Sequence, residues 1–434
     1  MSTLDETPVG LDDQPQNRGT RSRTALVMIV IFLVMVFNYM DRAILSVLLE
    51  PISRDLHLND AALGLLAGLP FAVLYALVGV PFARVADVGN RRLLIAGSVA
   101  VWSVATAACG LATGFASLFM LRVLVGIGEG AGTPAAHSAL ADNVSTSQRA
   151  LAASLFTLAA TVGGFLGYAL GGVLAGEFGW RFAFIAIGAP GVLVAALVLW
   201  LLPEKRVAPR WPSNAELFGS EALAVLGRLW RLPSFRLLVI GFTALYFVQM
   251  AVGQWAIVYL ARETGKSIGE IGIAFGFVSA IPMAIGSVIG GTLGGMLAKR
   301  DSGWLLRLPG ICAMLMAPGY ALFLMTSDWN VAIVAMGGVS FISGVYLGPM
   351  FAAMYTIAPS SERATAVALV AVFTNIIGAG VGPFIVGVLS SLLTPVFDAD
   401  ALKLSLLASL VLFVPAVACL MLGSAHLPKD ASHD

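Results

Sequence analysis

Long apolar stretches constrain this fold more than any other feature of the sequence. A bilayer core of about 30 Å is crossed by about 20 apolar residues in a helix. Each such segment is expected to be helical, because lipid offers no hydrogen bonds to its backbone. The expected fold class is an all-α membrane protein with twelve transmembrane helices in two six-helix bundles. The twelve stretches are 25–49, 61–84, 92–112, 116–141, 149–176, 181–202, 236–262, 268–298, 303–325, 330–356, 362–393 and 401–425.

The composition supports this class and argues against several others. Hydrophobic residues make up 59% of the 434 residues and charged residues 11%, against about 45–50% and about 25% in soluble domains. The net charge of +1 gives no reason to expect a nucleic-acid partner. The three cysteines all lie in apolar stretches, without disulfide or metal spacing. Because no phosphate loop, nucleophile elbow or zinc motif appears, we expect neither an enzyme nor a cofactor.

One long polar connection divides the chain. Residues 203–235 separate a predicted N-terminal bundle, 25–202, from a C-terminal bundle, 236–425. The connection is expected to hold an amphipathic helix, either on the inner membrane surface or as a plain linker. Lysine and arginine are concentrated on the side of the N-terminus, so both termini are predicted to be cytoplasmic. The tails 1–24 and 426–434 lie outside the bundles, and the first is expected to be disordered.

A short repeat relates the two halves. Residues 147–152 (SQRALA) begin the fifth stretch, and residues 361–366 (SERATA) begin the eleventh. The match falls at the same span of each half. It therefore indicates an internal duplication, which is typical of transporters.

Four ionisable residues lie inside the spans and are the main functional candidates. Asp41 and Arg42 are in the first span, and Arg122 and Glu129 are in the fourth. Charges at membrane depth usually mark a path for ions, protons or substrate. Asp41 and Arg122 lie at similar depths, roughly 9–12 Å from the outer end, so a salt bridge could join them if both face a cavity. The alternative is a structural ion cluster that locks the two spans together.

Polar residues elsewhere in the spans are weaker candidates for a cavity lining. His137 lies two turns beyond Glu129 and could relay protons, although a solvated histidine near the inner mouth is the favoured explanation. Tyrosine and glutamine also serve as packing contacts between helices. The candidates are Asn38, His137, Tyr246, Gln249, Gln254, Tyr346 and Asn375.

Three motifs carry a family resemblance. Residues 79–92 (GVPFARVADVGNRR) resemble the signature loop of the major facilitator superfamily, with Asp87, Arg91 and Arg92 in the expected places. The loop departs from that signature at Ala83, Val88 and Asn90. Asn90 before two basic residues is similar to the Spinster branch. Two further motifs resemble the same branch: 38–42 (NYMDR) and 122–130 (RVLVGIGEG).

The resemblance implies a carrier that rocks about a central cavity, in the plasma membrane, or the inner membrane of a bacterium. Its partners would be an amphipathic, lipid-like solute, protons and the bilayer, and a monomer is expected. Asp41 and Glu129 are the expected proton sites, and Arg42 and Arg122 would hold an anionic group or the carboxylates. A multidrug/proton antiporter is the main alternative, and a channel or membrane sensor is a third.

The signature loop implies an inner gate. In the superfamily the acidic residue that matches Asp87 caps the start of the eleventh span and closes the cytoplasmic side. Asp87, Arg91, Arg92 and Ser361 are therefore the expected gate residues. A simple pairing of Asp87 with a neighbouring arginine is the alternative.

Overall fold

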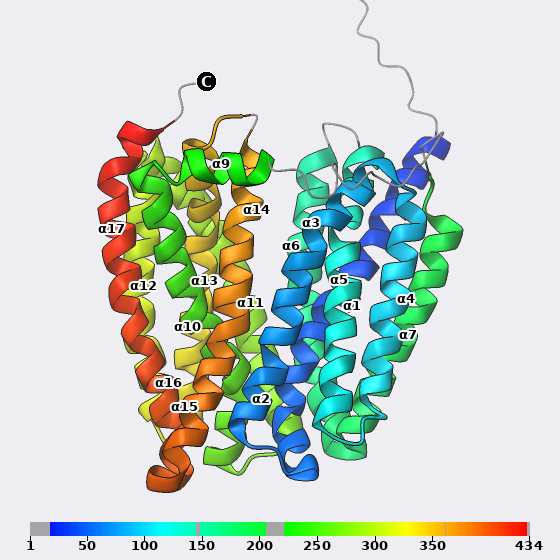
Figure 1. Ribbon diagram of the computed structural model, residues 1–434, viewed down its shortest axis with the longest axis vertical. Helices are drawn as coiled ribbons and strands as arrows, with labels where there is room; N and C mark the ends of the chain where they lie inside the picture. Colours follow the sequence, from blue (N-terminus) through cyan, green and yellow to red (C-terminus); the bar gives the residue numbers. More distant parts are fainter. Residues whose placement is uncertain (1–17, 145–147, 205–220, 361, 432–434) are drawn as a thin grey trace, which may run out of the picture.

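The computed structural model describes residues 18–144, 148–204, 221–360 and 362–431, and over this part of the chain the regular elements are helices. Figure 1 shows two bundles side by side, with their helices roughly along one axis. The first bundle contains α1 (Arg18–Leu56), α2 (Asp60–Ala67), α3 (Leu69–Val88), α4 (Arg91–Cys109), α5 (Phe115–Asn143), α6 (Arg149–Phe178) and α7 (Trp180–Leu201).

The second bundle comes after the connecting helix α9 (Glu221–Leu229). Figure 1 shows that α1 begins and α17 ends at the same end of the molecule, where α9 also lies. We call this end the terminal face and the opposite end the distal face. The bundle contains α10 (Pro233–Thr264), α11 (Ile268–Ala298), α12 (Trp304–Met325), α13 (Trp329–Ile357), α14 (Arg363–Phe373), the π-helix η2 (Thr374–Val381), α15 (Gly382–Phe397), α16 (Ala401–Ser409) and α17 (Phe413–Asp430).

The described helices confirm a membrane-spanning fold. Eleven helical stretches are long and apolar enough to cross a bilayer. The last of them, Thr365–Asp430, reverses direction at the turn Asp398–Asp400, where φ of Asp398 is +44°. It therefore contains two antiparallel crossings, and the described part of the chain has the expected twelve.

Two of the predicted spans are interrupted where the two bundles meet. The second breaks at Gly68 between α2 and α3, where a Cβ atom would collide with the carbonyl oxygen of Gly380. The eleventh contains η2, which faces this break across the two bundles. A π-helix is rare and commonly marks a functional position. Backbone contact between the bundles thus explains where these spans depart from a plain helix.

Glycine allows the helices to approach closely. In α6, a Cβ atom at Gly167 would lie 2.6 Å from the carbonyl oxygen of Met40 in α1. Across the bundles, a Cβ atom at Gly172 would lie 2.7 Å from the carbonyl oxygen of Ile268. A Cβ atom at Gly64 of α2 would lie 2.6 Å from the carbonyl oxygen of Pro383 in α15. The last two contacts lie toward the distal face, so the bundles touch there.

The connecting helix packs on the second bundle. Val225 and Leu229 of α9 are buried, and the ring of Trp230 stacks on Phe373 with centroids 5.9 Å apart. The apolar side of α9 is therefore buried, and the chain at its end packs against α14. Residues 205–220, which belong to the connection where the amphipathic helix is predicted, lie outside the described part.

Candidate functional site

An ion pair joins the two charged spans of the first bundle. The Nε atom of Arg42 donates to Oε2 of Glu129 at 2.7 Å. Glu129 is fully buried, whereas the side chain of Arg42 keeps 28% of its surface accessible. Removing one member of such a pair would leave the other as an uncompensated buried charge. The pair therefore fixes α1 against α5 as long as both residues are charged.

Aromatic rings surround the same guanidinium. Its central carbon lies 5.6 Å from the ring centroid of Tyr39, 5.0 Å from that of Phe71 and 4.6 Å from that of Tyr75. The guanidinium carbon of Arg122 also lies 5.8 Å from the centroid of Phe71. Cation–π contacts within about 6 Å are attractive. Both arginines therefore contact the ring of Phe71.

Asp41 and Arg122 do not form the ion pair that their depths allowed. Asp41 accepts a hydrogen bond from the hydroxyl of Thr106 in α4 at 3.0 Å, and its other carboxylate oxygen has no partner among the described residues. Arg122 is 2% exposed, and its Nε and Nη1 atoms also have no hydrogen-bond partner there. Successive helical residues are rotated by about 100°. Arg42 consequently faces the cavity while Asp41 faces α4.

A cavity of about 260 Å³ lies between the bundles. Drug-sized ligand pockets usually measure about 300–1,000 Å³, so this cavity is small for its kind. Its wall is cationic and aromatic on the side of the first bundle, and neutral and polar on the side of the second. The polar and aromatic lining residues are Tyr39, Arg42, Phe71, Arg122, Tyr168, Tyr246, Gln254 and Asn375.

The remaining cavity candidates lie elsewhere. The hydroxyl of Tyr346 donates to the side-chain oxygen of Gln249, and neither residue lines the cavity. His137 stacks on Phe156 of α6 with ring centroids 3.9 Å apart. Asn38 is 1% exposed in α1, one turn before Arg42. Of the weaker candidates, the structure thus brings Tyr246, Gln254 and Asn375 to the cavity.

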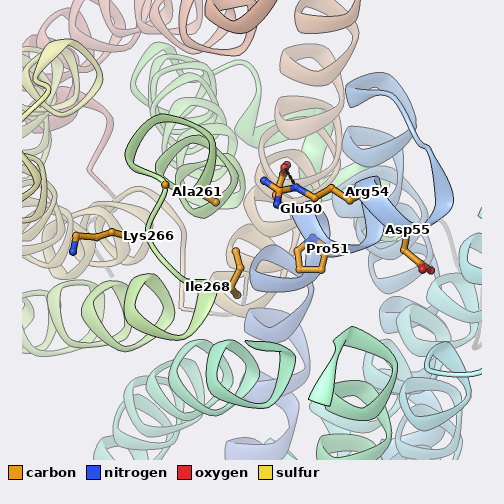
Figure 2. A pocket seen from close by; sticks show the side chains of 8 residues that line it. Glu50, Pro51, Arg54, Asp55, Ala261, Lys266 and Ile268 are labelled. Carbon is orange, nitrogen blue, oxygen red and sulfur yellow. Dashed lines mark hydrogen bonds and ion pairs between the residues drawn. The ribbon is translucent and has the colours of Figure 1, made fainter. Parts of the chain in front are cut away.

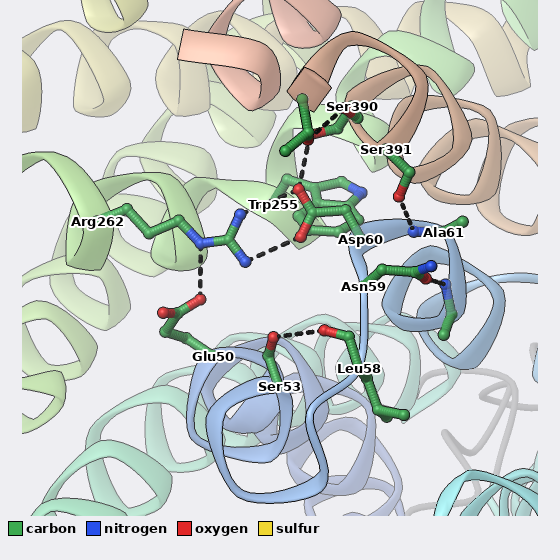
Figure 3. Close-up of polar contacts among 12 residues, drawn as sticks. Glu50, Ser53, Leu58, Asn59, Asp60, Ala61, Trp255, Arg262, Ser390 and Ser391 are labelled. Carbon is green, nitrogen blue, oxygen red and sulfur yellow. Dashed lines mark hydrogen bonds and ion pairs between the residues drawn. The ribbon is translucent and has the colours of Figure 1, made fainter. Parts of the chain in front are cut away.

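The distal face holds a charged network that the sequence did not reveal (Figure 3). Arg262 of α10 donates to Glu50 of α1 at 2.8 Å and to both carboxylate oxygens of Asp60 in α2 at 3.0 and 2.8 Å. Asp60 also accepts a hydrogen bond from the hydroxyl of Ser390 in α15 at 2.6 Å. We call Glu50, Asp60, Arg262 and Ser390 the distal lock. Its carboxylates and its serine are buried, and its members join the two bundles.

A pocket of about 530 Å³ lies beside the distal lock (Figure 2). Glu50 forms part of its wall and also accepts a hydrogen bond from Arg54 at 2.9 Å. Lys266 and Ile268 line the side that belongs to the second bundle. In sequence, the charges of the lock look like ordinary solvated residues at the ends of spans. The only sequence signal for the lock is that two acidic residues and one arginine stand at the outer ends of three predicted spans.

The terminal face holds three of the four predicted gate residues. Asp87 is exposed. Arg91 pairs with Asp142 at the end of α5 and donates to the carbonyl oxygen of Ala86 at 2.9 Å. The backbone of Arg92 donates to Glu204 at 3.3 Å. These arginine contacts stay within the first bundle and its end. Ser361 lies outside the described residues.

The chain matches a known family over most of its length. The model of the Major Facilitator Superfamily matches residues 31–383. An MFS-type efflux pump of Mycolicibacterium smegmatis is 33% identical over 423 residues, which cover 96% of each chain. Protein spinster homolog 1 of Rattus norvegicus is 29% identical over 398 residues, covering 86% of this chain and 74% of the rat protein.

Two solved structures share this fold. A bacterial homologue of the human lysosomal transporter Spinster, in an inward-facing and unoccupied conformation, superimposes with a TM-score of 0.83 at 29% identity, covering 94% of this chain and 98% of that one. Its inward-facing, occupied form gives 0.82 at 30% identity, with 96% and 99% covered. These relatives are transporters and not enzymes. The protein belongs to the major facilitator superfamily of membrane transporters, in its Spinster branch.

Proposed function

We propose that this transporter is a proton-coupled carrier of an amphipathic, lipid-like solute of the lysophospholipid or sphingolipid type. The observation that supports this most is the central cavity with two arginines beside two buried carboxylates. The cavity is lined by both bundles, so rocking of one bundle against the other would expose it to each face in turn. A channel or sensor would not need this arrangement.

Protons would act through the carboxylates. A proton on Glu129 would remove the charge that holds Arg42 at 2.7 Å, and the guanidinium would then be free to bind another anion. Asp41 keeps one carboxylate oxygen without a partner among the described residues, where a proton could bind. Proton binding and arginine position are linked in this scheme. Substrate and proton would therefore act on the same charges.

The substrate would be held by its anionic group. Arg122 has two side-chain nitrogens without partners among the described residues and lines the cavity. A guanidinium binds carboxylate or phosphate through two parallel hydrogen bonds. Tyr39, Phe71 and Met250 supply apolar surface nearby for an acyl chain or ring. The mycobacterial relative supports the alternative substrate class, since it is an MFS-type efflux pump.

We assign the terminal face to the cytoplasm of a plasma membrane, or of the inner membrane in a bacterium, and the distal face to the outside. The protein would act as a monomer. With this orientation the distal lock closes the outer side. A closed outer side corresponds to an inward-facing state. The likeness to two inward-facing transporter structures supports this state for the present structure.

Transport in proteoliposomes tests this proposal. We expect wild-type protein to move a lysophospholipid or a fluorescent drug faster when a proton gradient is imposed. Asp41→Asn and Glu129→Gln should lose the response to the gradient although both variants still fold. His137→Gln, which changes an ionisable residue outside the cavity lining, serves as the matched control. Gradient-driven transport that survives in both carboxylate variants would refute proton coupling through this site.

A further inference from the structure

Two glycines in the cavity wall have no packing reason to be glycine. Gly164 in α6 and Gly253 in α10 both line the central cavity. A Cβ atom built on either residue would meet no other heavy atom within 4 Å. The backbone at neither position has a positive φ. An alanine would therefore fit at each position without strain.

Neighbouring glycines in the same helices behave differently. A Cβ atom at Gly163 would collide with the carbonyl oxygen of Val36 and lie 2.9 Å from Cβ of Tyr39. A Cβ atom at Gly241 of α10 would lie 2.9 Å from the side chain of Leu420. Close packing explains these glycines. It does not explain Gly164 or Gly253, although glycine weakens a helix interior relative to alanine.

The position of the pair suggests what they do instead. The contact between Gly163 and α1 places Gly164 near the level of Tyr39. In α10, Gly253 lies between Met250 and Gln254 on the cavity side. One glycine belongs to each bundle, so the two positions border the cavity from both of its halves. In a space of about 260 Å³, each added side chain would take a large share of the room.

We propose that Gly164 and Gly253 set the upper size limit for the apolar part of the substrate. This inference rests on the proposed function in one respect, that the central cavity is the transport site. It does not depend on whether the solute is a lipid or a drug. The two arginines would fix the polar end of the substrate, and the two open glycine positions would leave room for its apolar part.

Size selectivity of leucine variants tests the inference. The probes are lysophosphatidylglycerols of increasing acyl length and anionic dyes of increasing ring number, each taken up by proteoliposomes. For Gly164→Leu and Gly253→Leu we expect uptake of the smaller members to persist. Uptake of the largest should fall by about tenfold or more, because a few methylenes in an apolar site change rates by that order. Gly295→Leu is the matched control, since Gly295 in α11 is exposed and equally unobstructed.

A second measurement separates this inference from the proposed function. Wild-type protein that transports neither series would refute the function. The size limit would then be tested in a chain whose three native cysteines are replaced by alanine. In the variants Gly164→Cys and Gly253→Cys of that chain, the new thiol should react with a small membrane-permeant reagent and much more slowly with a bulky one. Unchanged size selectivity in both leucine variants, or equal reaction with small and bulky reagents, would overturn the size limit.

Discussion

At the scale of single residues, the position of a charge was predictable, but its partner was not. The depth of Asp41, Arg42, Arg122 and Glu129 in apolar helices is evident from the sequence. Which residues pair depends on how each helix is rotated about its axis, and packing determines that rotation. Arg42 binds Glu129, whereas Asp41 turns to Thr106. Depth alone left a salt bridge between Asp41 and Arg122 open, on the condition that both face the cavity; Asp41 does not line it, and Arg42 and Arg122 do.

The pairing of Arg42 with Glu129 predicts a non-additive effect on stability. Arg42→Ala would leave a buried carboxylate without its partner, which costs about 3–5 kcal/mol. Adding Glu129→Gln should restore much of that loss, because a neutral amide needs no counter-ion. Thermal unfolding of both variants in detergent measures the difference. Equal melting temperatures for the single and double variants would show that the ion pair is not what stabilises α1 against α5.

At the scale of helices, the number and approximate positions of the spans were predictable from hydropathy, but their limits and interruptions were not: α1 begins at Arg18, inside the tail that was expected to be disordered. The break at Gly68 and the π-helix η2 arise where the backbones of the two bundles meet. Such contacts join residues roughly 300 positions apart in the chain. Local sequence patterns carry little information about them. The distal lock was not predictable for the same reason, since Arg262 lies far along the chain from Glu50 and Asp60.

The glycine contacts between α1 and α6 predict a position-dependent cost. Gly167→Ala would place a methyl group 2.6 Å from the carbonyl oxygen of Met40 and 2.7 Å from Cβ of Ala43. Overpacking of this kind costs about 1–3 kcal/mol. Gly164→Ala, one turn earlier in the same helix, should leave the melting temperature unchanged or raise it. A similar fall in melting temperature for both variants would contradict the packing described for α6.

At the scale of the whole molecule, the exposed Asp87 is a candidate inner gate. We propose that it caps the start of α14 when the carrier opens outward and separates when it opens inward. Here Glu362, at the start of α14, binds Arg228 of α9. Asp87→Asn should shift spin-label distances between the loops at 84–92 and 357–364 toward longer values. Lack of any shift would favour the alternative that Asp87 pairs locally.

The central claim is that the two bundles rock about the cavity and that the distal lock holds the outer side closed. Spin labels at Thr113 and Ser327, one in a distal loop of each bundle, report on that side directly. Because Arg262 binds both Glu50 and Asp60, Arg262→Ala should remove the ionic attraction between the bundles at the distal lock. Arg54→Ala is the matched control, since Arg54 also binds Glu50 but belongs to the same helix.

The most direct test is the distance distribution between these two labels by double electron–electron resonance in nanodiscs. We predict a single distance population in the wild-type protein and in Arg54→Ala at neutral pH. We predict a second, longer population in Arg262→Ala, and in the wild-type protein when acidic pH and substrate are combined. A single unchanged distance under all of these conditions would contradict alternating access through the distal face.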